Sequence, residues 1–397
     1  MDFTPILPTD MKGNIDAHLL HLAEEVCIKS AMLKGTHNTQ IMYALKELLR
    51  KTNSYYSNKI ESEGTHPLDI DRAMKKEFFT NKKEKDLQLL SLAHIEVQKY
   101  VENYCEDFSH SPFSREFILS IHKEFYSKDG MEVFLNVTNK DETLKMIPGE
   151  LRDRDVAIRN HIAPEASKLT GLMNAFENLY KIPESSTQAL KLIYAISSHH
   201  RLTWIHPFLD GNGRVSRLLL DGVFKSIDLD GYGLWNISRG LARDSQEYKK
   251  QLAFAEMPIQ GSTDGRGPLS VRGLTYYIEF MLSSALDQIE YMSKHLQLSS
   301  LGSKIEKYVT LSQQGLLDTQ LLPDYSTHLF KELLISGELA RGKVKTVIGK
   351  QDRTATSLIK KLIEMDYIES DTPKSAIRLK FNSHFASYLI PELIPPK

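Results

Sequence analysis

The stretch HPFLDGNGRVSR (residues 206–217) decides the fold of this chain. It places a histidine, an aspartate, two glycines, an asparagine and two arginines between two apolar segments, TWI before it and LLLDGVF after it. GNG followed by RVSRLLLDGVF is typical of a tight turn that opens into a helix. Glycines let the backbone approach a ligand closely, and the first N–H groups of a helix are unpaired. The sequence therefore predicts an anion site at this helix start.

The side chains of the stretch extend this prediction to a nucleotide. Arg214 and Arg217 lie three residues apart on one helix face, a spacing that suits a di- or triphosphate. Asp210 is a hard oxygen ligand suited to Mg²⁺ together with phosphates. His206 is the natural general base, because its pKa is ordinarily near neutrality. Each residue alone has a simpler explanation as a helix cap or surface partner, but together they favour transfer from a nucleotide to a hydroxyl. The stretch is not a GxxxxGK[ST] loop.

The composition is that of an ordinary globular protein. The chain has 397 residues, a length that favours two or three domains. It is 41% hydrophobic and 25% charged, and its formal net charge of -1 gives no reason to expect global nucleic-acid affinity. Its two cysteines, Cys27 and Cys105, lack metal-ligand spacing and favour a reduced, cytoplasmic setting. We expect no signal peptide, because the N-terminus lacks a charged region followed by an apolar run. We also expect no membrane partner, since no apolar stretch approaches ~20 residues.

Most of the chain is predicted to be helical. Apolar residues recur every three or four positions in residues 169–180, 189–199 and 274–289. Residues 146–164 lack this helical spacing. They contain a Pro-Gly pair followed by alternating apolar and polar residues, which indicates a short hairpin or extended flap. The sequence pattern changes again near Leu301, because the long helical patterns end there and turn-like segments begin. We expect a mainly α fold with an N-terminal helical region (1–110), a core (111–300) and a C-terminal domain (301–397).

The stretch resembles the signature of the Fic (AMP-transferase) family, HPFx[DE]GN[GK]RxxR, at every specified position. The similarity covers roughly residues 40–260. It implies an all-α core of about eight helices with a small β-hairpin flap beside the active site. It also implies a reaction, the transfer of AMP from ATP to a Ser, Thr or Tyr hydroxyl of a protein, with release of pyrophosphate.

The resemblance assigns roles to residues of this chain. His206 would be the base, Asp210 the Mg²⁺ ligand, and Arg214 and Arg217 the groups that bind the β- and γ-phosphates. Gly213 favours AMP transfer, because family members with Lys there can transfer phosphate instead. The residues expected to contact the nucleotide are Glu61, Val156, Ala157, Ile158, Arg159, Asp210, Gly211, Asn212, Gly213, Arg214, Val215, Ser216, Arg217 and Tyr248.

The flap matches the family pattern PGEYRxxxVxVG with two departures. Leu151 replaces the usual Tyr, and Arg159 replaces the usual Gly where the flap would lie over the adenine. The flap edge is expected to pair with the backbone of the target protein by strand addition. Downstream, WNISRGLARDSQEY resembles the segment that closes the nucleotide-base pocket, with Tyr248 as the expected contact.

An upstream segment, SNKIESEG, resembles the inhibitory motif [ST]xxxE[GN] of the same family, near the end of a helix expected at about 40–62. Ser57 and Glu61 are four residues apart and share a helix face. By resemblance, Glu61 would pair with Arg217 and keep ATP in a non-productive pose. Ser62 stands where Gly or Asn is expected. Without this context, an ordinary surface glutamate would be the simpler interpretation.

The C-terminal domain adds a second hypothesis. Residues 341–380 contain ten Lys or Arg against five acidic residues. Two helical patterns and a strand pair resemble a winged helix-turn-helix. Four of its residues would face a DNA groove if it binds DNA: Thr354, Thr356, Lys360 and Lys361. An interaction or dimerisation module on the same fold is the alternative.

Two functions follow from these observations. The first is a protein adenylyltransferase that is autoinhibited by its own helix, with ATP and a hydroxyl-bearing protein as partners. The second is a regulator whose core binds nucleotide as a signal and whose C-terminal domain binds DNA. The presence of His206 favours the first, since a sensor needs no base. Removal of AMP by the same site stays open, and Fic proteins with an N-terminal inhibitory helix often form homodimers.

Overall fold

The computed structural model describes residues 3–397, except for residues 108, 139–141 and 159–160. In this part the chain forms sixteen α-helices and three small sheets, so the predicted mainly α fold is confirmed. The three apolar patterns correspond to α6 (Leu169–Leu179), α7 (Gln188–Ile205) and α11 (Val271–His295). Along α7, the residues Leu192 and Ile193 are fully buried, which is the face that the spacing predicted.

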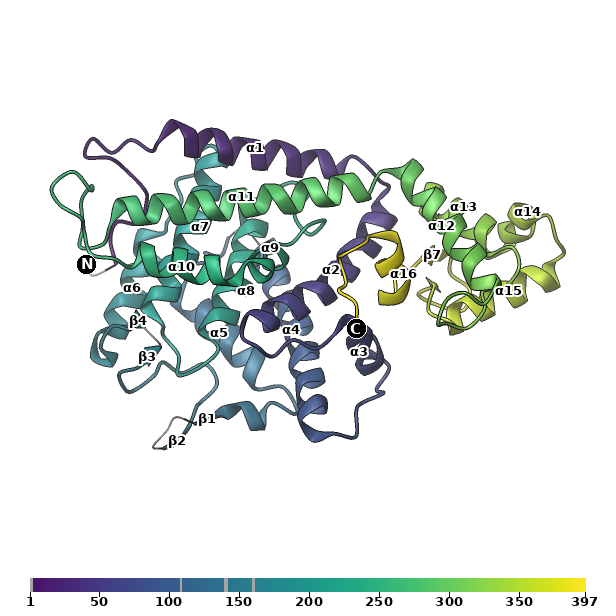
Figure 1. Ribbon diagram of the computed structural model, residues 1–397, viewed down its shortest axis with the longest axis horizontal. Coiled ribbons are helices and arrows are strands. Elements are labelled where there is room, and N and C mark those ends of the chain that lie inside the picture. Colours follow the sequence, from purple (N-terminus) through teal and green to yellow (C-terminus); the bar gives the residue numbers. More distant parts are fainter. Residues whose placement is uncertain (1–2, 108, 139–141, 159–160) are drawn as a thin grey trace.

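The helices pack into a bundle around α7 and α8 (Asn212–Ser226). Helix α1 (Ala17–Lys34) lies along the long helix α11 on one side of the bundle, and α7 contacts both (Figure 1). Helix α8 packs against α7 and α4. The other helices of the bundle are α2 (Thr39–Ile60), α3 (Pro67–Met74), α4 (Lys82–Glu106), α5 (Arg115–Tyr126), α9 (Ile237–Arg243) and α10 (Ser245–Ala255). Asn38 begins α2 by accepting a hydrogen bond from Ile41 N at 3.0 Å.

The segment between α5 and α6 carries the extended structure of the bundle. Strands β1 (Asn136–Thr138) and β2 (Thr143–Lys145) pair antiparallel, and so do β3 (Ala157–Ile158) and β4 (His161–Ile162). Two short 3₁₀ helices flank them, η1 (Glu132–Leu135) and η2 (Ala166–Lys168). The predicted flap is thus a short antiparallel hairpin. Arg159, its second departure from the family pattern, lies outside the described residues.

The remaining chain forms a smaller group of elements beyond α11 (Figure 1). A three-stranded sheet has the order β5-β7-β6, with antiparallel pairs throughout. The elements are α12 (Leu298–Gln313), α13 (Ser326–Ser336), β5 (Glu338–Leu339), η3 (Arg341–Lys343), α14 (Val344–Ile348), α15 (Asp352–Glu364), β6 (Ile368–Glu369), β7 (Ile377–Leu379) and α16 (Ser383–Leu389). Two helices followed by a strand pair match the predicted order, while the winged-helix assignment stays a prediction.

The C-terminal residues return to the bundle beside α2 and α3 (Figure 1). Tyr56 donates a hydrogen bond to the Leu393 carbonyl at 3.0 Å, and Lys397 forms an ion pair with Asp69 at 2.7 Å. One cluster of buried apolar residues extends from the bundle into these last elements. The division of the chain near residue 301 therefore stays a prediction. Among the described residues, no helix is both long enough and apolar enough to cross a membrane.

Candidate active site

The loop between α7 and α8 is held in shape by two backbone conformations and one asparagine. His206 ends α7 and Gly211 precedes α8, both in the left-handed region, with φ of 50° and 80°. A Cβ at residue 211 would lie 2.5 Å from the Tyr126 hydroxyl, so this position requires glycine. The Asn212 amide accepts from the Phe208 N–H at 2.9 Å and donates to the Phe208 carbonyl at 2.8 Å. The loop is thereby fixed against the start of α8.

The start of α8 has the character of an anion site. Its N-cap residue, Gly211, has no side chain that could cap the helix. The first N–H groups of the helix and the positive end of its dipole attract a negative group. The carboxylate of Glu61 lies close to this helix start, because a Cβ at Gly213 would be only 2.3 Å from Glu61 Oε1.

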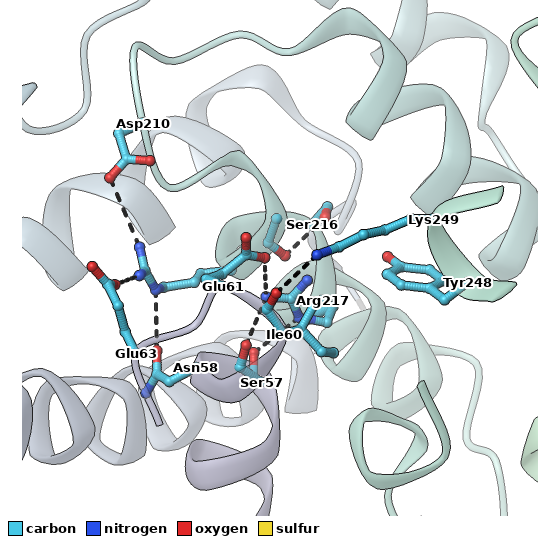
Figure 2. A network of polar contacts seen from close by, with 12 residues as sticks. Ser57, Asn58, Ile60, Glu61, Glu63, Asp210, Ser216, Arg217, Tyr248 and Lys249 are labelled. Carbon is cyan, nitrogen blue, oxygen red and sulfur yellow. Dashed lines mark hydrogen bonds and ion pairs between the residues drawn. The ribbon is translucent and has the colours of Figure 1, made fainter. Parts of the chain in front are cut away.

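Arg217, on α8, is enclosed by residues from the end of α2 (Figure 2). Its side chain is 2% exposed, and Nη2 lies 2.7 Å from Glu61 Oε1, so the predicted ion pair is present. The guanidinium also donates to the Ser57 hydroxyl at 2.9 Å and to the Ser57 carbonyl at 3.0 Å. Ser57 and Glu61 therefore act from one face of α2, as their spacing predicted.

Arg214, one turn earlier on α8, is held by a second acidic residue of the same segment. Its side chain is 3% exposed and forms an ion pair with Glu63. It also donates to Asn58 Oδ1 at 3.0 Å and to the Tyr126 hydroxyl at 2.9 Å, while Asp210 lies 3.9 Å away. Residues 57–63, which we call the inhibitory segment after the family motif that they resemble, thus contact both arginines of the signature.

The end of α2 explains how two acids of one segment reach two arginines. Ser62 is in the left-handed region with φ of 66°, and its N–H bonds to the Lys59 carbonyl at 2.9 Å. The Glu63 N–H returns to the Asn58 carbonyl at 2.9 Å, which completes a Schellman-type helix end. Gly and Asn adopt this conformation most readily, whereas Ser62 adopts it with some strain. The departure from the family pattern therefore leaves the helix end intact.

The charges at this interface compensate one another. Burial raises the pKa of Glu61, but the positive charges of Arg217 and Arg214 outweigh burial and hold that pKa below its ordinary value. Burial lowers the pKa of Arg214 to about 10, so its guanidinium stays protonated at neutral pH. Two buried cations without these acids would carry a large desolvation cost. The inhibitory segment is therefore bound to α8 mainly through charge.

His206 lies at the end of α7, beside the start of α8. Burial is the main reason why its pKa falls to about 3, and the neighbouring His161 and Arg152 side chains add to this effect. The imidazole is therefore neutral at pH 7, the form that can accept a proton. Its carbonyl accepts a hydrogen bond from Arg152 Nε at 2.8 Å, which fixes the backbone of the loop to the flap.

Asp210 is the candidate metal ligand. Its side chain is 52% exposed and lies next to the helix start, which fits a Mg²⁺ ion that is held by one carboxylate and by nucleotide phosphates. The described residues contain no group of three or more His, Cys, Asp or Glu side chains placed to hold a metal. Asp210 therefore fits Mg²⁺ only in company with a phosphate ligand.

The flap is anchored to the active-site loop by Arg152. The Arg152 N–H bonds to the Pro207 carbonyl at 2.9 Å, and its guanidinium donates to the carbonyls of Arg154 at 2.8 Å and Pro164 at 2.5 Å. These bonds place β3, with Val156 just before it and Ala157 and Ile158 within it, on the same side of the bundle as His206. The sequence assigned Arg152 only to a pattern and did not predict this anchoring role.

Three residues of the predicted nucleotide set face the core. Val215 and Ser216 are at most 1% exposed, and the Ser216 hydroxyl donates to the Gly213 carbonyl at 3.0 Å. Tyr248 is 2% exposed, and its hydroxyl lies 2.9 Å from His199 Nε2. As placed in this structure, none of the three side chains has a free face toward a ligand, because each is already used in packing or hydrogen bonding.

Three residues at the site were missed by sequence reasoning. Glu63 and Asn58 lie inside the quoted segment SNKIESEG, and their charge and polarity beside Glu61 were a usable signal. Tyr126, by contrast, lies on α5, far from both motifs in sequence, and contacts Gly211 and Arg214 only through the fold. No local pattern could have identified it.

Comparisons with known proteins agree with this geometry. Residues 112–223 match the sequence profile described as "Fic/DOC family". "Protein adenylyltransferase Fic" of Drosophila melanogaster is 44% identical over 73 residues, which are 18% of this chain and 15% of the relative. The relative of the same name from Drosophila willistoni is 36% identical over 98 residues, 25% of this chain and 19% of the relative. The chain thus spans less than a quarter of these curated relatives.

Two solved structures share the fold at low sequence identity. "Fic-1 (aa134 - 508) from C. elegans" aligns with a TM-score of 0.54 and 15% identity, over 71% of this chain and 74% of that one. A Fic family protein from Desulfovibrio desulfuricans G20 aligns with a TM-score of 0.50 and 17% identity, over 92% and 97% of the two chains. The helical bundle, its flap and the α8 motif define a Fic-type fold. This chain carries a Fic/DOC-family domain.

Proposed function

We propose that this protein is a protein adenylyltransferase that transfers AMP from ATP to a Ser, Thr or Tyr hydroxyl of a target protein. The proposal rests mainly on the close arrangement of a base, a helix start and two arginines at the start of α8. A neutral base, His206, lies beside an uncapped helix start that bears two buried arginines. The similarity to proteins named adenylyltransferases supports the same reaction class.

The reaction follows from these groups. The target hydroxyl loses its proton to His206 while its oxygen forms a bond to the α-phosphorus of ATP. The bond between the α-phosphorus and the bridging oxygen to the β-phosphate breaks, and pyrophosphate leaves. Arg214, Arg217 and the first N–H groups of α8 hold the departing phosphates. Mg²⁺, held by Asp210 and the phosphates, would supply charge neutralisation when it is bound.

Autoinhibition follows from the occupancy of both arginines. ATP phosphates and the carboxylates of the inhibitory segment require the same groups, since Glu61 lies against Gly213 and Arg217, and Glu63 pairs with Arg214. ATP must therefore displace these carboxylates or bind with its phosphates elsewhere. The wild-type protein is expected to be nearly inactive, and the inhibitory contact would be released by a change at the end of α2.

Labelled ATP tests the reaction. In the Glu61→Gly variant, label from the α-phosphate is expected to become protein-bound, through self-modification or on a lysate protein, while label from the γ-phosphate is not. Incorporation of the γ label would show phosphate transfer instead. Incorporation of neither label, although the variant binds ATP, would favour the second function, nucleotide sensing.

The second function has one observation in its favour. The predicted DNA-facing residues Thr354, Thr356, Lys360 and Lys361 are all exposed on one helix, α15. A labelled DNA duplex would be shifted by the full chain, and the shift would fade steeply with salt, if this helix binds DNA. An unchanged duplex at low salt would leave α15 as a protein-facing or solvated helix.

A further inference from the structure

A second imidazole lies beside the candidate base. His161, on β4 of the flap, has its ring centroid 5.7 Å from that of His206, with the two ring planes tilted by 46°. His161 Nδ1 lies 2.9 Å from Oε2 of Glu256, the residue directly after α10. The two side chains are only 14% and 17% exposed. Three separate elements therefore bring an imidazole and a carboxylate to the base.

The Nε2 atom of His161 makes no hydrogen bond, within the part of the chain that the structure describes, that would explain its position. His161 Nε2 is buried and has no hydrogen-bond partner among the described residues. Buried polar atoms in proteins nearly always have a partner, so this atom is an exception that needs a reason. Because the Glu256 carboxylate only accepts hydrogen bonds, the ring in its neutral form carries its proton on Nδ1 and presents a lone pair at Nε2. An acceptor thus lies close to His206.

His206 needs such an acceptor when it acts. A base that takes a proton becomes positively charged, and a buried charge is unfavourable without compensation. Among its neighbours, Arg152 and a protonated His161 oppose this charge, whereas a backbone hydrogen bond with Thr203 and the carboxylate of Glu61 favour it. Under the proposed function, ATP displaces Glu61. The nearby acid that then remains is Glu256, which acts through His161.

We propose that His161 and Glu256 are positioning residues for His206. Nε2 of His161 accepts a hydrogen bond from the imidazolium that His206 becomes, and the Glu256 carboxylate compensates its charge. This inference rests on the proposed function. In the reaction the hydroxyl proton moves to His206, the bond from oxygen to the α-phosphorus forms and pyrophosphate leaves. His161 and Glu256 neither gain nor lose atoms in this step, a role like that of the third residue in other base-containing triads.

Other charged groups limit the size of the effect. The charged and titratable groups around the two imidazoles are Glu61 after α2, Arg152 before β3, His200 and Arg201 in α7, and Glu256 after α10. Burial lowers the pKa of His200 well below its ordinary value, so it adds no charge at neutral pH. The Arg201 guanidinium acts on Glu256 and partly offsets its carboxylate. We therefore expect only part of the ~10²–10⁴-fold that a general base contributes.

Kinetics of the full chain test the proposal in a Glu61→Gly background. His161→Ala and Glu256→Gln are each expected to slow AMP transfer at saturating ATP roughly tenfold, with an unchanged ATP concentration for half-maximal rate. Imidazole added to the buffer should restore part of the rate to His161→Ala, because it can replace the missing acceptor. The matched control is His21→Ala, an exposed histidine on α1, which should behave as its parent. An unchanged maximal rate, or slowing without rescue by imidazole, would overturn the proposal.

Nitrogen-15 NMR of the histidine rings gives a readout that needs no catalysis. In its neutral form, His161 is expected to carry its proton on Nδ1, and Glu256→Gln should change the ring signals of both His161 and His206. A proton on Nε2 of His161, or an unchanged His206 signal in the folded variant, would overturn the proposal. If the Glu61→Gly parent transfers no AMP, the proposed function fails and this NMR result alone decides the inference.

Discussion

The interface between α2 and α8 and the outer face of α15 both carry basic side chains, but their surroundings differ. Arg214 and Arg217 are at most 3% exposed, and each meets a carboxylate of the inhibitory segment. Lys360 on α15 is 77% exposed, and its ion pair with Glu364 of the same helix has a separation of 3.8 Å. A buried charge is tolerated only with a partner, whereas an exposed pair contributes about 0–1 kcal/mol. The buried arginines therefore point to a specific function, and the exposed lysines do so much less.

The largest expected effect tests the base. In the Glu61→Gly background, His206→Ala should reduce the rate of AMP transfer about 10²–10⁴-fold, because the variant lacks the imidazole that is proposed to take the hydroxyl proton. The rate is followed by incorporation of α-labelled ATP, with His21→Ala as the matched histidine control. A variant that keeps more than a tenth of the parent rate would show that His206 is not the base.

The next effect tests the contact between Glu61 and Arg217. Glu61→Gly removes a charge-assisted hydrogen bond of about 1.5–3 kcal/mol, so ATP affinity should rise about 10- to 100-fold and thermal stability should fall. Calorimetry with ATP and thermal unfolding measure the two changes, and ATP should restore the lost stability. The exposed Glu24→Gln variant on α1 should change neither quantity.

The same contact predicts a pH dependence of stability. The folded-state pKa of Glu61 lies below its ordinary value of 4.5, so its stabilising contribution is fully present above that value. The contribution is lost as pH falls below 4.5 through the folded pKa. The stability difference between wild type and Glu61→Gly should therefore be constant near neutrality and shrink in acid. A difference that grows in acid would contradict the assigned charge of Glu61.

A smaller effect distinguishes the two acids. Glu63→Gln should raise ATP affinity by roughly 3- to 10-fold, because Arg214 keeps its bonds to Asn58 and Tyr126. The double variant Glu61→Gly/Glu63→Gln should bind ATP more tightly than either single variant. If Glu63→Gln has no effect by calorimetry, Arg214 is already available to ATP and only one acid inhibits.

A change at Ser62 should strengthen the inhibitory contact. Glycine adopts the left-handed conformation without strain, so Ser62→Gly should stabilise the folded chain by about 0.4–1 kcal/mol and lower the residual AMP transfer about 2- to 5-fold. Thermal unfolding and labelled ATP measure these changes. Increased transfer would mean that the conformation of residue 62 does not support the inhibitory segment.

The smallest effect is expected on α15. Lys360→Ala and Lys361→Ala should change stability by no more than about 0.5 kcal/mol and leave AMP transfer unaltered, since both residues are exposed and far from α8 in the fold. A DNA duplex is the useful probe for them. Lost AMP transfer in these variants would show that α15 communicates with the active site.

Sequence reasoning predicted the parts of this site that local patterns encode. The helices follow from apolar spacing, and the pair of Glu61 with Arg217 follows from a motif match together with one helix face. Packing adds what local patterns do not encode. Tyr248 and Val215 belong to recognisable segments, and the fold buries their side chains in the core, so their contact with a nucleotide stays a prediction. His161 and Glu256 show no pattern, because only the tertiary structure brings the flap and the end of α10 together.

The most direct measurement is the intact mass of three proteins after incubation with Mg²⁺-ATP: wild type, Glu61→Gly and Glu61→Gly/His206→Ala. The account predicts added adenylyl groups on Glu61→Gly alone, because only this variant combines an Arg217 released from Glu61 with an intact base. Equal modification of wild type would contradict autoinhibition by Glu61. Equal modification of the double variant would contradict the role of His206.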